Sequence, residues 1–324
     1  MAPQLILGTA SFGMDMTEFQ DADSVANILG KLEKLGINRV DTAARYPPPR
    51  PGRSEELIGE AMGQLGGLDL NLSIDTKVYT NTATDGSGDL GREALLRSLG
   101  KSLQRLKTQI NVLYSHRPDP STPLEEQIQA FNEQIELGTI TSWGVANTPL
   151  HVLKRVLAIC EERGWQKPLC YQGHYSLISR AAEKELLPLL RRHNMSFVVY
   201  QILEAGFLTG KFLNNQHAGT RFDDENPLGK FAQSVFADEA LHAAVKKLDT
   251  KVKEKGLTMT EVAVRLAVHQ LALGDNDAVI IGASKAAQLE ETVRMIRKGP
   301  LPAEFLELAD ELWATLEPSR GNKI

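Results

Sequence analysis

Short apolar segments alternate with amphipathic stretches along the chain, and this alternation constrains the fold more than any other feature. Eight segments are rich in Val, Ile or Leu, as expected of parallel strands that are covered on both faces. The strands are predicted at 5–8, 37–41, 72–77, 110–116, 140–145, 169–172, 196–200 and 278–282. Between most of them, apolar residues recur every three to four positions, which is typical of helices that bury one face.

Eight strand–helix units without a linker or a change of composition predict one α/β domain over residues 1–324. The predicted architecture is a (β/α)₈ TIM barrel of eight parallel strands with its active site at the C-terminal face. A doubly wound open sheet is the alternative, but no G-x-G-x-x-G follows the first strand. Residues 201–237 are polar, contain glycine and lack a helical period, so they are predicted to form a long functional loop.

Composition limits the classes of partner. A net charge of −5 with scattered Lys and Arg argues against nucleic acid as the main partner. No apolar run is long enough to cross a membrane, and no basic leader precedes one, so the cytoplasm is the expected location. Cys160 and Cys170 have no C-x-x-C partner, so reduced, buried thiols are expected rather than zinc ligands.

A polar side chain stands at or just beyond the carboxyl end of seven predicted strands. These residues are Asp41, Lys77, His116, Asn147, Gln172, Tyr200 and Ser284. The carboxyl ends of barrel strands converge on one face, where barrel enzymes hold their active sites. One such residue is usually a loop contact or a helix cap, whereas seven in register indicate a functional site.

The chemistry of this set narrows the reaction. A metal site would need several His and carboxylate ligands together, and a nucleophilic triad would need a G-x-S-x-G elbow. Asp41, Lys77 and His116, with Tyr46 nearby, instead provide an acid, an ammonium, an imidazole and a phenol. A phenol beside an ammonium suits donation of a proton to a carbonyl oxygen as hydride arrives.

An estimate of charge effects predicts how the phenol would be tuned. A lysine ammonium about 4 Å away, at an effective dielectric of ~20, favours the phenolate by about 4 kcal/mol. The pKa of Tyr46 is therefore expected to fall from ~10 towards neutrality, with Asp41 holding Lys77 charged. His116 is expected to orient the carbonyl oxygen or to relay the proton.

These residues stand in an order that resembles a known family. Residues 41–46 and 52–55 resemble the D-T-A-x-x-Y-x-x-G-x-S-E signature of the aldo-keto reductases. Lys77, and His116 in Ser-His-Arg-Pro-Asp, look like that family's catalytic Lys and H-x-P-D motif. The resemblance implies that Asp41, Tyr46, Lys77 and His116 are catalytic, that NADPH/NADP⁺ binds across the barrel mouth, and that no metal takes part.

The resemblance continues through the motifs that hold the cofactor. Gly-Val-Ala-Asn at 144–147 resembles G-x-S-N, and residues 203–211 resemble the P-L-A-G-G-x-L-T-G-K loop. Residues 282–285 with Gln288 resemble the element that binds the adenosine 2′-phosphate. The cofactor residues implied are Asp41, Asn147, Gln172, Tyr200, Leu203, Gly206, Leu208, Gly210, Lys211, Gly282, Ser284, Lys285, Gln288, Glu291 and Thr292. Residues 171–177 look closest to the aflatoxin aldehyde reductase-like branch.

Three departures from the family pattern carry predictions. Pro-Pro-Pro-Arg-Pro at 47–51 gives five residues where the signature has two, which predicts a stiff loop over the substrate pocket. Ala146 stands where the family has Ser, so one hydroxyl contact to the nicotinamide amide is expected to be missing. Gln201-Ile202 replaces Ser-Pro or Asn-Pro after Tyr200, which predicts a different backbone beside the stacking tyrosine.

The predicted substrate is a small carbonyl compound, and four residues are predicted to face it. The candidates are Phe12, His174, Tyr175 and Arg221, with packing within the loop as the alternative for His174 and Tyr175. Arg50, Arg53, Arg221 and Arg320 are candidates for binding an anionic substrate or are solvated loop residues.

The resemblance implies NADPH-dependent reduction of an aldehyde or ketone to an alcohol. A nucleotide-sensing regulatory subunit of the same fold, with slow turnover, is the alternative function. A metal-dependent hydrolase on the same barrel is disfavoured by the single strand-end histidine.

Overall fold

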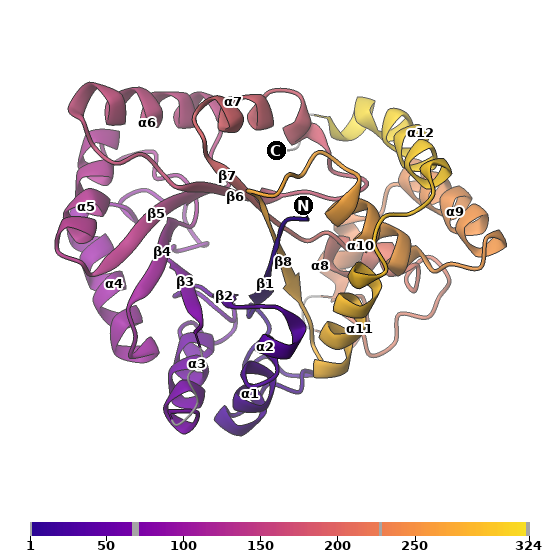
Figure 1. Ribbon diagram of the computed structural model, residues 1–324, viewed down its shortest axis with the longest axis horizontal. Helices are drawn as coiled ribbons and strands as arrows, with labels where there is room; N and C mark the ends of the chain where they lie inside the picture. The colour runs from indigo at the N-terminus through magenta and orange to yellow at the C-terminus, as the bar shows by residue number, and fades with distance from the viewer. Residues whose placement is uncertain (1, 67–70, 227–228, 322–324) are drawn as a thin grey trace.

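In the computed structural model, which describes residues 2–66, 71–226 and 229–321, eight parallel strands close into one barrel. The strands are β1 (Gln4–Gly8), β2 (Arg39–Asp41), β3 (Ser73–Lys77), β4 (Ile110–Ser115), β5 (Ile140–Ala146), β6 (Cys170–His174), β7 (Ser196–Tyr200) and β8 (Ala278–Gly282). Each pairs with its neighbours in chain order, and β1 pairs with β8 to complete the ring. The predicted (β/α)₈ barrel is therefore confirmed (Figure 1).

Helices surround the strands in Figure 1. They are α1 (Ala22–Leu29), α2 (Leu32–Leu35), α3 (Arg53–Gln64), α4 (Arg92–Leu106), α5 (Leu124–Glu136), α6 (Leu150–Arg163), α7 (Leu186–Arg192), α8 (Gly229–Val235), α9 (Glu239–Glu254), α10 (Met259–His269), α11 (Ala286–Arg297) and α12 (Ala303–Arg320), with short 3₁₀ turns η1 (Ala181–Glu183) and η2 (Glu204–Thr209). Five of them, α3, α8, α9, α10 and α12, were not predicted from the sequence.

The segment 201–237 is more ordered than predicted. It contains η2 and α8, and four of its phenylalanines, Phe207, Phe212, Phe222 and Phe236, pack on one another as part of the large core. Phe207 stacks on Phe236 with ring centroids 4.6 Å apart, and Phe212 stacks on Phe222 at 4.8 Å. The described residues of this segment thus form the long loop predicted after β7, with two short helical elements and packed phenylalanines that the sequence pattern did not reveal.

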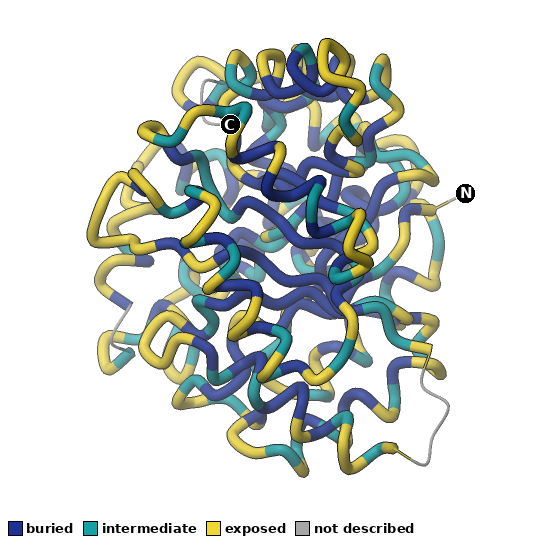
Figure 2. Tube along the Cα trace, turned by 90° about the vertical axis from the view of Figure 1, so that its left-hand side faces the viewer, coloured by how far each residue is buried: buried dark blue, intermediate teal, exposed yellow. Residues whose placement is uncertain are grey.

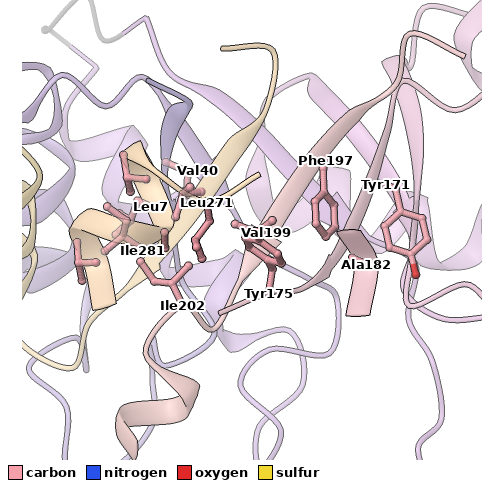
Figure 3. Close-up of a cluster of buried hydrophobic side chains, with 14 of the residues drawn as sticks. Leu7, Val40, Tyr171, Tyr175, Ala182, Phe197, Val199, Ile202, Leu271 and Ile281 are labelled. Atoms are coloured by element: carbon pink, nitrogen blue, oxygen red, sulfur yellow. The ribbon is translucent and has the colours of Figure 1, made fainter. Parts of the chain in front are cut away.

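Alternation along the strands divides the apolar residues into two cores. Side chains such as Leu7, Val40 and Ile281 belong to the large core between barrel and helices, part of which Figure 3 shows. The alternate residues belong to a smaller core inside the barrel, namely Ile6, Val112, Tyr114, Cys170, Val198, Ala278 and Ile280. The buried strands accordingly run through the middle of the molecule in Figure 2, with exposed segments outside. Strands covered on both faces have the near-continuous apolar pattern seen in the sequence.

One glycine sets the position of α3, the helix that follows the predicted catalytic loop. A Cβ atom added at Gly59 would lie 1.9 Å from the carbonyl oxygen of Arg105, at the end of α4. No side chain larger than hydrogen fits this contact, so Gly59 lets α3 pack directly against α4. The N-terminus of α3, which holds Ser54 and Glu55, is thereby fixed beside the barrel mouth.

Two further observations concern the hydropathy of the helices and the state of the two cysteines. Among the described residues, no helix combines the length and the hydropathy needed to cross a membrane. Cys160 and Cys170 are both buried and unpaired with each other, and burial raises the pKa of the Cys170 thiol to about 11.

Candidate active site

The centre of the candidate site is a buried ion pair between neighbouring strands. Lys77, at the end of β3, places its Nζ atom 2.7 Å from both carboxylate oxygens of Asp41, at the end of β2. The same ammonium donates to the carbonyl oxygen of Thr42 at 2.8 Å. Three acceptors match the three N–H groups of the ammonium, so its direction is fixed. Burial lowers the pKa of Lys77, but Asp41 and Tyr46 together raise it above its usual value, and the ammonium stays charged.

Asp41 is also held from the opposite side of the mouth. Gln172, on β6, donates its Nε2 hydrogen to Asp41 Oδ1 at 2.8 Å. Asp41, Lys77 and Gln172 are each at most 3% exposed. The predicted Asp41, Lys77 and Gln172 therefore form one hydrogen-bonded group, in which the amide of Gln172 is already engaged by protein.

Tyr46 and His116 lie beside this group. Their rings meet edge to face with centroids 5.6 Å apart, and Lys77 Nζ lies 5.2 Å from the centroid of the Tyr46 ring. Burial raises the pKa of Tyr46, Lys77 lowers it and Asp41 raises it again, so that the net direction is upward. The predicted fall towards neutrality is wrong, because the charge of Asp41 offsets that of Lys77 and burial penalises the phenolate. The phenol is held protonated.

His116 is held as a neutral imidazole. Burial lowers its pKa, and the positive charges of Lys77, Arg45 and Arg117 lower it further, to about 3. Its Nδ1 atom is buried and has no hydrogen-bond partner among the described residues. A buried polar atom left in this state is costly unless a ligand or water satisfies it. Arg45 was not predicted as part of the site, although it directly precedes Tyr46 in the sequence.

Asn147 and Tyr200 connect the next strands of the mouth. The Tyr200 hydroxyl donates to Asn147 Oδ1 at 2.6 Å, and Asn147 Nδ2 donates to the carbonyl oxygen of His116 at 3.1 Å. His174 stacks on the Tyr200 ring, with centroids 5.8 Å apart and an angle of 10° between the planes. A planar ligand stacking on Tyr200 would therefore take the opposite face of the ring. Asn147 keeps a second amide hydrogen that neither of these contacts uses.

The loop that carries Tyr46 is anchored despite its proline-rich insertion. The backbone N–H of Ser54 donates to the carbonyl oxygen of Tyr46 at 3.0 Å, and the Ser54 hydroxyl donates to the carbonyl oxygen of Thr9 at 3.0 Å. Glu55 is fully buried, where it accepts hydrogen bonds from Thr76 at 2.7 Å and from Arg105 at 3.1 Å. The Ser-Glu end of the signature thus ties both ends of the insertion to the barrel.

The predicted cofactor loop has the backbone geometry that glycine permits. Gly206 and Gly210 have φ values of 102° and 76°, in the region that residues with a Cβ rarely adopt. Leu208 is fully buried beneath them, while Lys211 is exposed. Leu203 is half-buried at the start of the turn.

The predicted phosphate element lies at the N-terminus of α11. Gln288 Oε1 accepts from the backbone N–H groups of Ser284 at 3.0 Å and Lys285 at 3.2 Å. Glu18, from the loop after β1, accepts from the next amide, that of Ala286, at 2.9 Å. The Lys285 side chain is exposed beside these groups.

The remaining members of this element have separate positions. Thr292 donates to the carbonyl oxygen of Gln288 at 2.8 Å, one turn along α11, and Glu291 is exposed. Gly282, the last residue of β8, is also exposed.

Several predicted substrate residues do not face the mouth. Tyr175 is fully buried, donates its hydroxyl hydrogen to Glu183 at 2.6 Å, and accepts from the amide of Ala272. Phe12 is fully buried against Phe19, with ring centroids 4.6 Å apart. For Tyr175 the structure supports the alternative of packing, and the prediction that Phe12 faces the substrate is corrected, since both rings are fully buried. His174 does reach the mouth, through its contact with Tyr200.

The arginines that are candidates for binding an anionic substrate differ in their burial and in their contacts within the protein. Arg320 is buried and donates to the carbonyl oxygen of Ile178 at 2.8 Å. Arg50 pairs with Asp15 at 2.9 Å, and Arg53 pairs with Glu56 and with Glu60. Arg221 lies exposed on the segment between η2 and α8.

Sequence reasoning missed Glu204, which is buried at the start of η2. Its carboxylate contacts His174, Ser176 and Ser179. The available signal was an ionisable residue at the position where the P-L-A-G-G loop motif has Ala.

The residues of the mouth suit a nicotinamide dinucleotide and a carbonyl compound. Beside a protonated phenol lie the Tyr200 ring, the amide of Asn147 and an imidazole nitrogen that has no partner in the described part of the chain. Two glycines with left-handed backbone follow, where a side chain would be strained. Within the described part of the chain, no group of three or more His, Cys, Asp or Glu could hold a metal ion.

Comparison with known proteins shows which family the chain resembles over most of its length. The model of the Aldo/keto reductase family matches residues 4–314. An aldo-keto reductase of Pseudocercospora fijiensis is 32% identical over 90% of this chain and 97% of its own length. Aflatoxin B1 aldehyde reductase member 2 of Mus musculus is 31% identical, over 97% and 85%. A probable voltage-gated potassium channel subunit beta of Arabidopsis thaliana is 28% identical, over 92% and 90%.

Proposed function

Because this chain belongs to the aldo/keto reductase family, whose model matches residues 4–314, we propose that it reduces an aldehyde or ketone to an alcohol with NADPH. The observation that carries the proposal is that Nδ1 of His116, in the ring next to the protonated phenol of Tyr46, has no partner within residues 2–66, 71–226 and 229–321. A carbonyl oxygen at this point would meet a proton donor and a neutral imidazole together. The family's reductase relatives, such as the mouse aldehyde reductase, support the same reaction class.

In the proposed reduction, each residue of the mouth has a separate role. NADPH, when bound, supplies the hydride that reaches the carbonyl carbon. Tyr46 donates its proton to the carbonyl oxygen, a task for which a phenol that stays protonated is suited. His116, being neutral, orients that oxygen by a hydrogen bond. Lys77 stabilises the phenolate left behind, and Asp41 with Gln172 keeps the ammonium aimed. A positioned acid of this kind contributes about 10²–10⁴-fold to the rate.

A preference for NADPH over NADH would rest on the N-terminus of α11. Lys285 is exposed there beside Ser284, and charge-assisted hydrogen bonds to a phosphate are worth about 1.5–3 kcal/mol in suitable geometry. The carboxylate of Glu18 lies on the amide of Ala286, so a 2′-phosphate would also meet a negative charge. We therefore expect Lys285→Ala to weaken NADPH binding roughly 10-fold and Glu18→Gln to strengthen it, with NADH changed in neither variant.

The test of the proposed function is direct. The purified chain is mixed with NADPH and a panel of aldehydes and ketones, and the loss of NADPH absorbance is followed. Turnover that is abolished in Tyr46→Phe supports the proposal, because that variant removes only the phenolic hydroxyl. Carbonyl reduction that proceeds equally in Tyr46→Phe would contradict it.

A second candidate function is a nucleotide-sensing regulatory subunit. The similarity to the potassium channel subunit favours it, since that relative covers nearly the same length of this chain as the reductases. Tight NADPH binding with negligible turnover of every carbonyl, together with copurification of a stoichiometric partner protein, would support this function.

We also infer that residues 1–324 act as one domain and that the protein works in the cytoplasm. The buried, unpaired thiols of Cys160 and Cys170 are consistent with a reducing compartment. Expression in cells as a fusion with a fluorescent protein would test the location.

A further inference from the structure

The backbone is strained immediately after Tyr200. Gln201, Glu204 and Ala205 have φ values of 60°, 51° and 56°, and all three carry side chains that disfavour this left-handed region. Residues held in this way are strained and persist only where their surroundings enforce them. The strained turn lies between the Tyr200 ring and the proposed cofactor loop that ends at Lys211, so its conformation affects both.

The carboxylate of Glu204 fixes this turn from within the protein. Only 1% of the residue is exposed, and its carboxylate contacts side chains at the end of β6 and in the loop that follows. Oε1 accepts from the hydroxyls of Ser176 and Ser179, the latter at 2.7 Å. Oε2 lies 3.0 Å from Nε2 of His174. Burial raises the pKa of Glu204, but His174 and the two serines together lower it below its usual value, so the carboxylate stays ionised.

His174 extends the same contacts to Tyr200. The two residues end β6 and β7 and are directly opposite each other in the strand register. Their rings stack at 5.8 Å with planes 10° apart. On its other side, the Tyr200 hydroxyl is held by Asn147 at 2.6 Å. The ring is therefore fixed both at its hydroxyl and on one of its faces.

We propose that His174 and Glu204 are positioning residues, which hold the Tyr200 ring and the turn 201–206 as one rigid platform for the nicotinamide ring. This inference rests on the proposed function, in which Tyr200 stacks on the nicotinamide. Neither residue touches the reacting atoms. His174 supports the face of the tyrosine opposite to the ligand, and Glu204 supports both His174 and the strained backbone. A Tyr200 ring supported in this way would hold the nicotinamide ring more accurately than a tyrosine whose side chain is free to rotate.

Three variants separate this role from a general structural one. His174→Leu removes the stacking ring, His174→Phe keeps a ring but loses the contact with Glu204, and Glu204→Gln keeps the size but removes the charge. The matched control is Glu183→Gln, a carboxyl in the neighbouring η1 turn that bonds to Tyr175 and Arg180, away from the mouth. All four are compared by NADPH titration with protein fluorescence and by single-turnover reduction.

We expect His174→Leu to weaken NADPH binding and to slow the single-turnover step, each by about 3- to 10-fold, since aromatic contacts are of that strength. His174→Phe is expected to restore most of both losses. Glu183→Gln should bind NADPH and turn over as the unmodified protein does. A His174→Leu variant with unchanged affinity and unchanged single-turnover rate would overturn the proposal.

A second measurement needs no cofactor. Amide hydrogen exchange of the unliganded protein should be faster over residues 201–206 in Glu204→Gln and in His174→Leu, but not in Glu183→Gln. Unchanged exchange in both variants would overturn the platform. Faster exchange in a protein that binds no NADPH at all would support the rigid unit while contradicting the proposed function.

Discussion

Two buried ion pairs stand on the same two strands of the barrel, two residues apart. Asp41 and Lys77 form the pair at the mouth, with contacts of 2.7 Å. Arg39 and Asp75 form the pair one layer deeper, also at 2.7 Å. Because side chains alternate along a strand, β2 and β3 present both pairs to the barrel interior. Burial of an ion pair therefore does not by itself distinguish a catalytic pair from a structural one.

Their surroundings distinguish the two pairs. Asp75 accepts a further hydrogen bond from Asn111 at 2.8 Å, and beside the pair Tyr114 bonds to Cys170 at 3.1 Å. The deeper pair therefore belongs to a polar network closed by protein groups. The mouth pair borders a phenol and an imidazole whose Nδ1 lacks a partner among the described residues. An unfinished hydrogen-bond network next to a proton donor distinguishes the candidate site from the structural pair.

Replacing Tyr46 should have the largest effect and should affect only the mouth. Tyr46→Phe removes the proposed proton donor and little volume, so kcat should fall by about 10²–10⁴-fold. The thermal midpoint and the affinity for NADPH should hardly change. Steady-state kinetics with a good carbonyl substrate and a cofactor titration measure both. A kcat above a third of the original value would remove Tyr46 from the role of acid.

Matched substitutions at the two cations should separate chemistry from stability. Lys77→Met should reduce kcat about as much as Tyr46→Phe does, and the double variant should be little worse, because the two residues act as a unit. Arg39→Met should leave kcat nearly intact but lower the free energy of unfolding by about 3–5 kcal/mol, since Asp75 loses its charged partner. Denaturant midpoints and kcat for both variants test this division. Equal losses of activity at the two sites would break it.

The loss of folding stability at acidic pH should depend on the protonation of His116. Its pKa is lowered from 6.5 to about 3, so the folded state holds the ring neutral. This contribution to stability is present above pH 6.5 and is lost as the pH falls from there towards 3. His116→Gln should therefore lose less stability than the unmodified protein between pH 6.5 and pH 4. Thermal midpoints across this range measure the difference, and identical slopes would contradict the neutral imidazole.

Asp75 should change the pH dependence of folding stability in the direction opposite to His116, and this is the smallest effect that we expect. Burial raises its pKa to about 6, although Arg39 and Asn111 act against this. Its contribution is therefore complete below pH 3.8 and is lost as the pH rises through 6. The stability advantage of the unmodified protein over Asp75→Asn should shrink as the pH rises from 4 to 7. An advantage that grows over this range would show that the deeper pair is fully ionised.

The sequence predicted the barrel and the mouth well, for a definite physical reason. Strand periodicity and the polar residues at strand ends are local signals, and Asp41, Lys77 and Gln172 do meet as strand-end residues should. Arg39 and Asp75 were also within reach, since each stands two residues before a residue already singled out. Reading the strands with a period of two would have placed them in the layer below.

Other features could not be predicted from the sequence, because they depend on contacts between residues that are far apart along the chain. The pKa of Tyr46 depends on the balance of burial, Lys77 and Asp41, which only the three-dimensional arrangement sets. The partners of Glu204 come from another loop, at a sequence separation of 25 residues or more. Tyr175 was ambiguous because adjacent strand-end residues face opposite ways, and the sequence alone does not say which one faces the mouth.

The closure of the ring by β1 and β8 has a consequence for biosynthesis. Residues 4–8 must wait for residues 278–282 before they gain their second neighbour. A chain emerging from the ribosome therefore exposes a strand edge for most of its synthesis, and such edges pair readily with other chains. The buried Arg320, which donates to the carbonyl oxygen of Ile178, joins later still. The synthesis of residues 278–282 thus turns an open, association-prone sheet into a closed one, and the nascent protein should depend on chaperones until then.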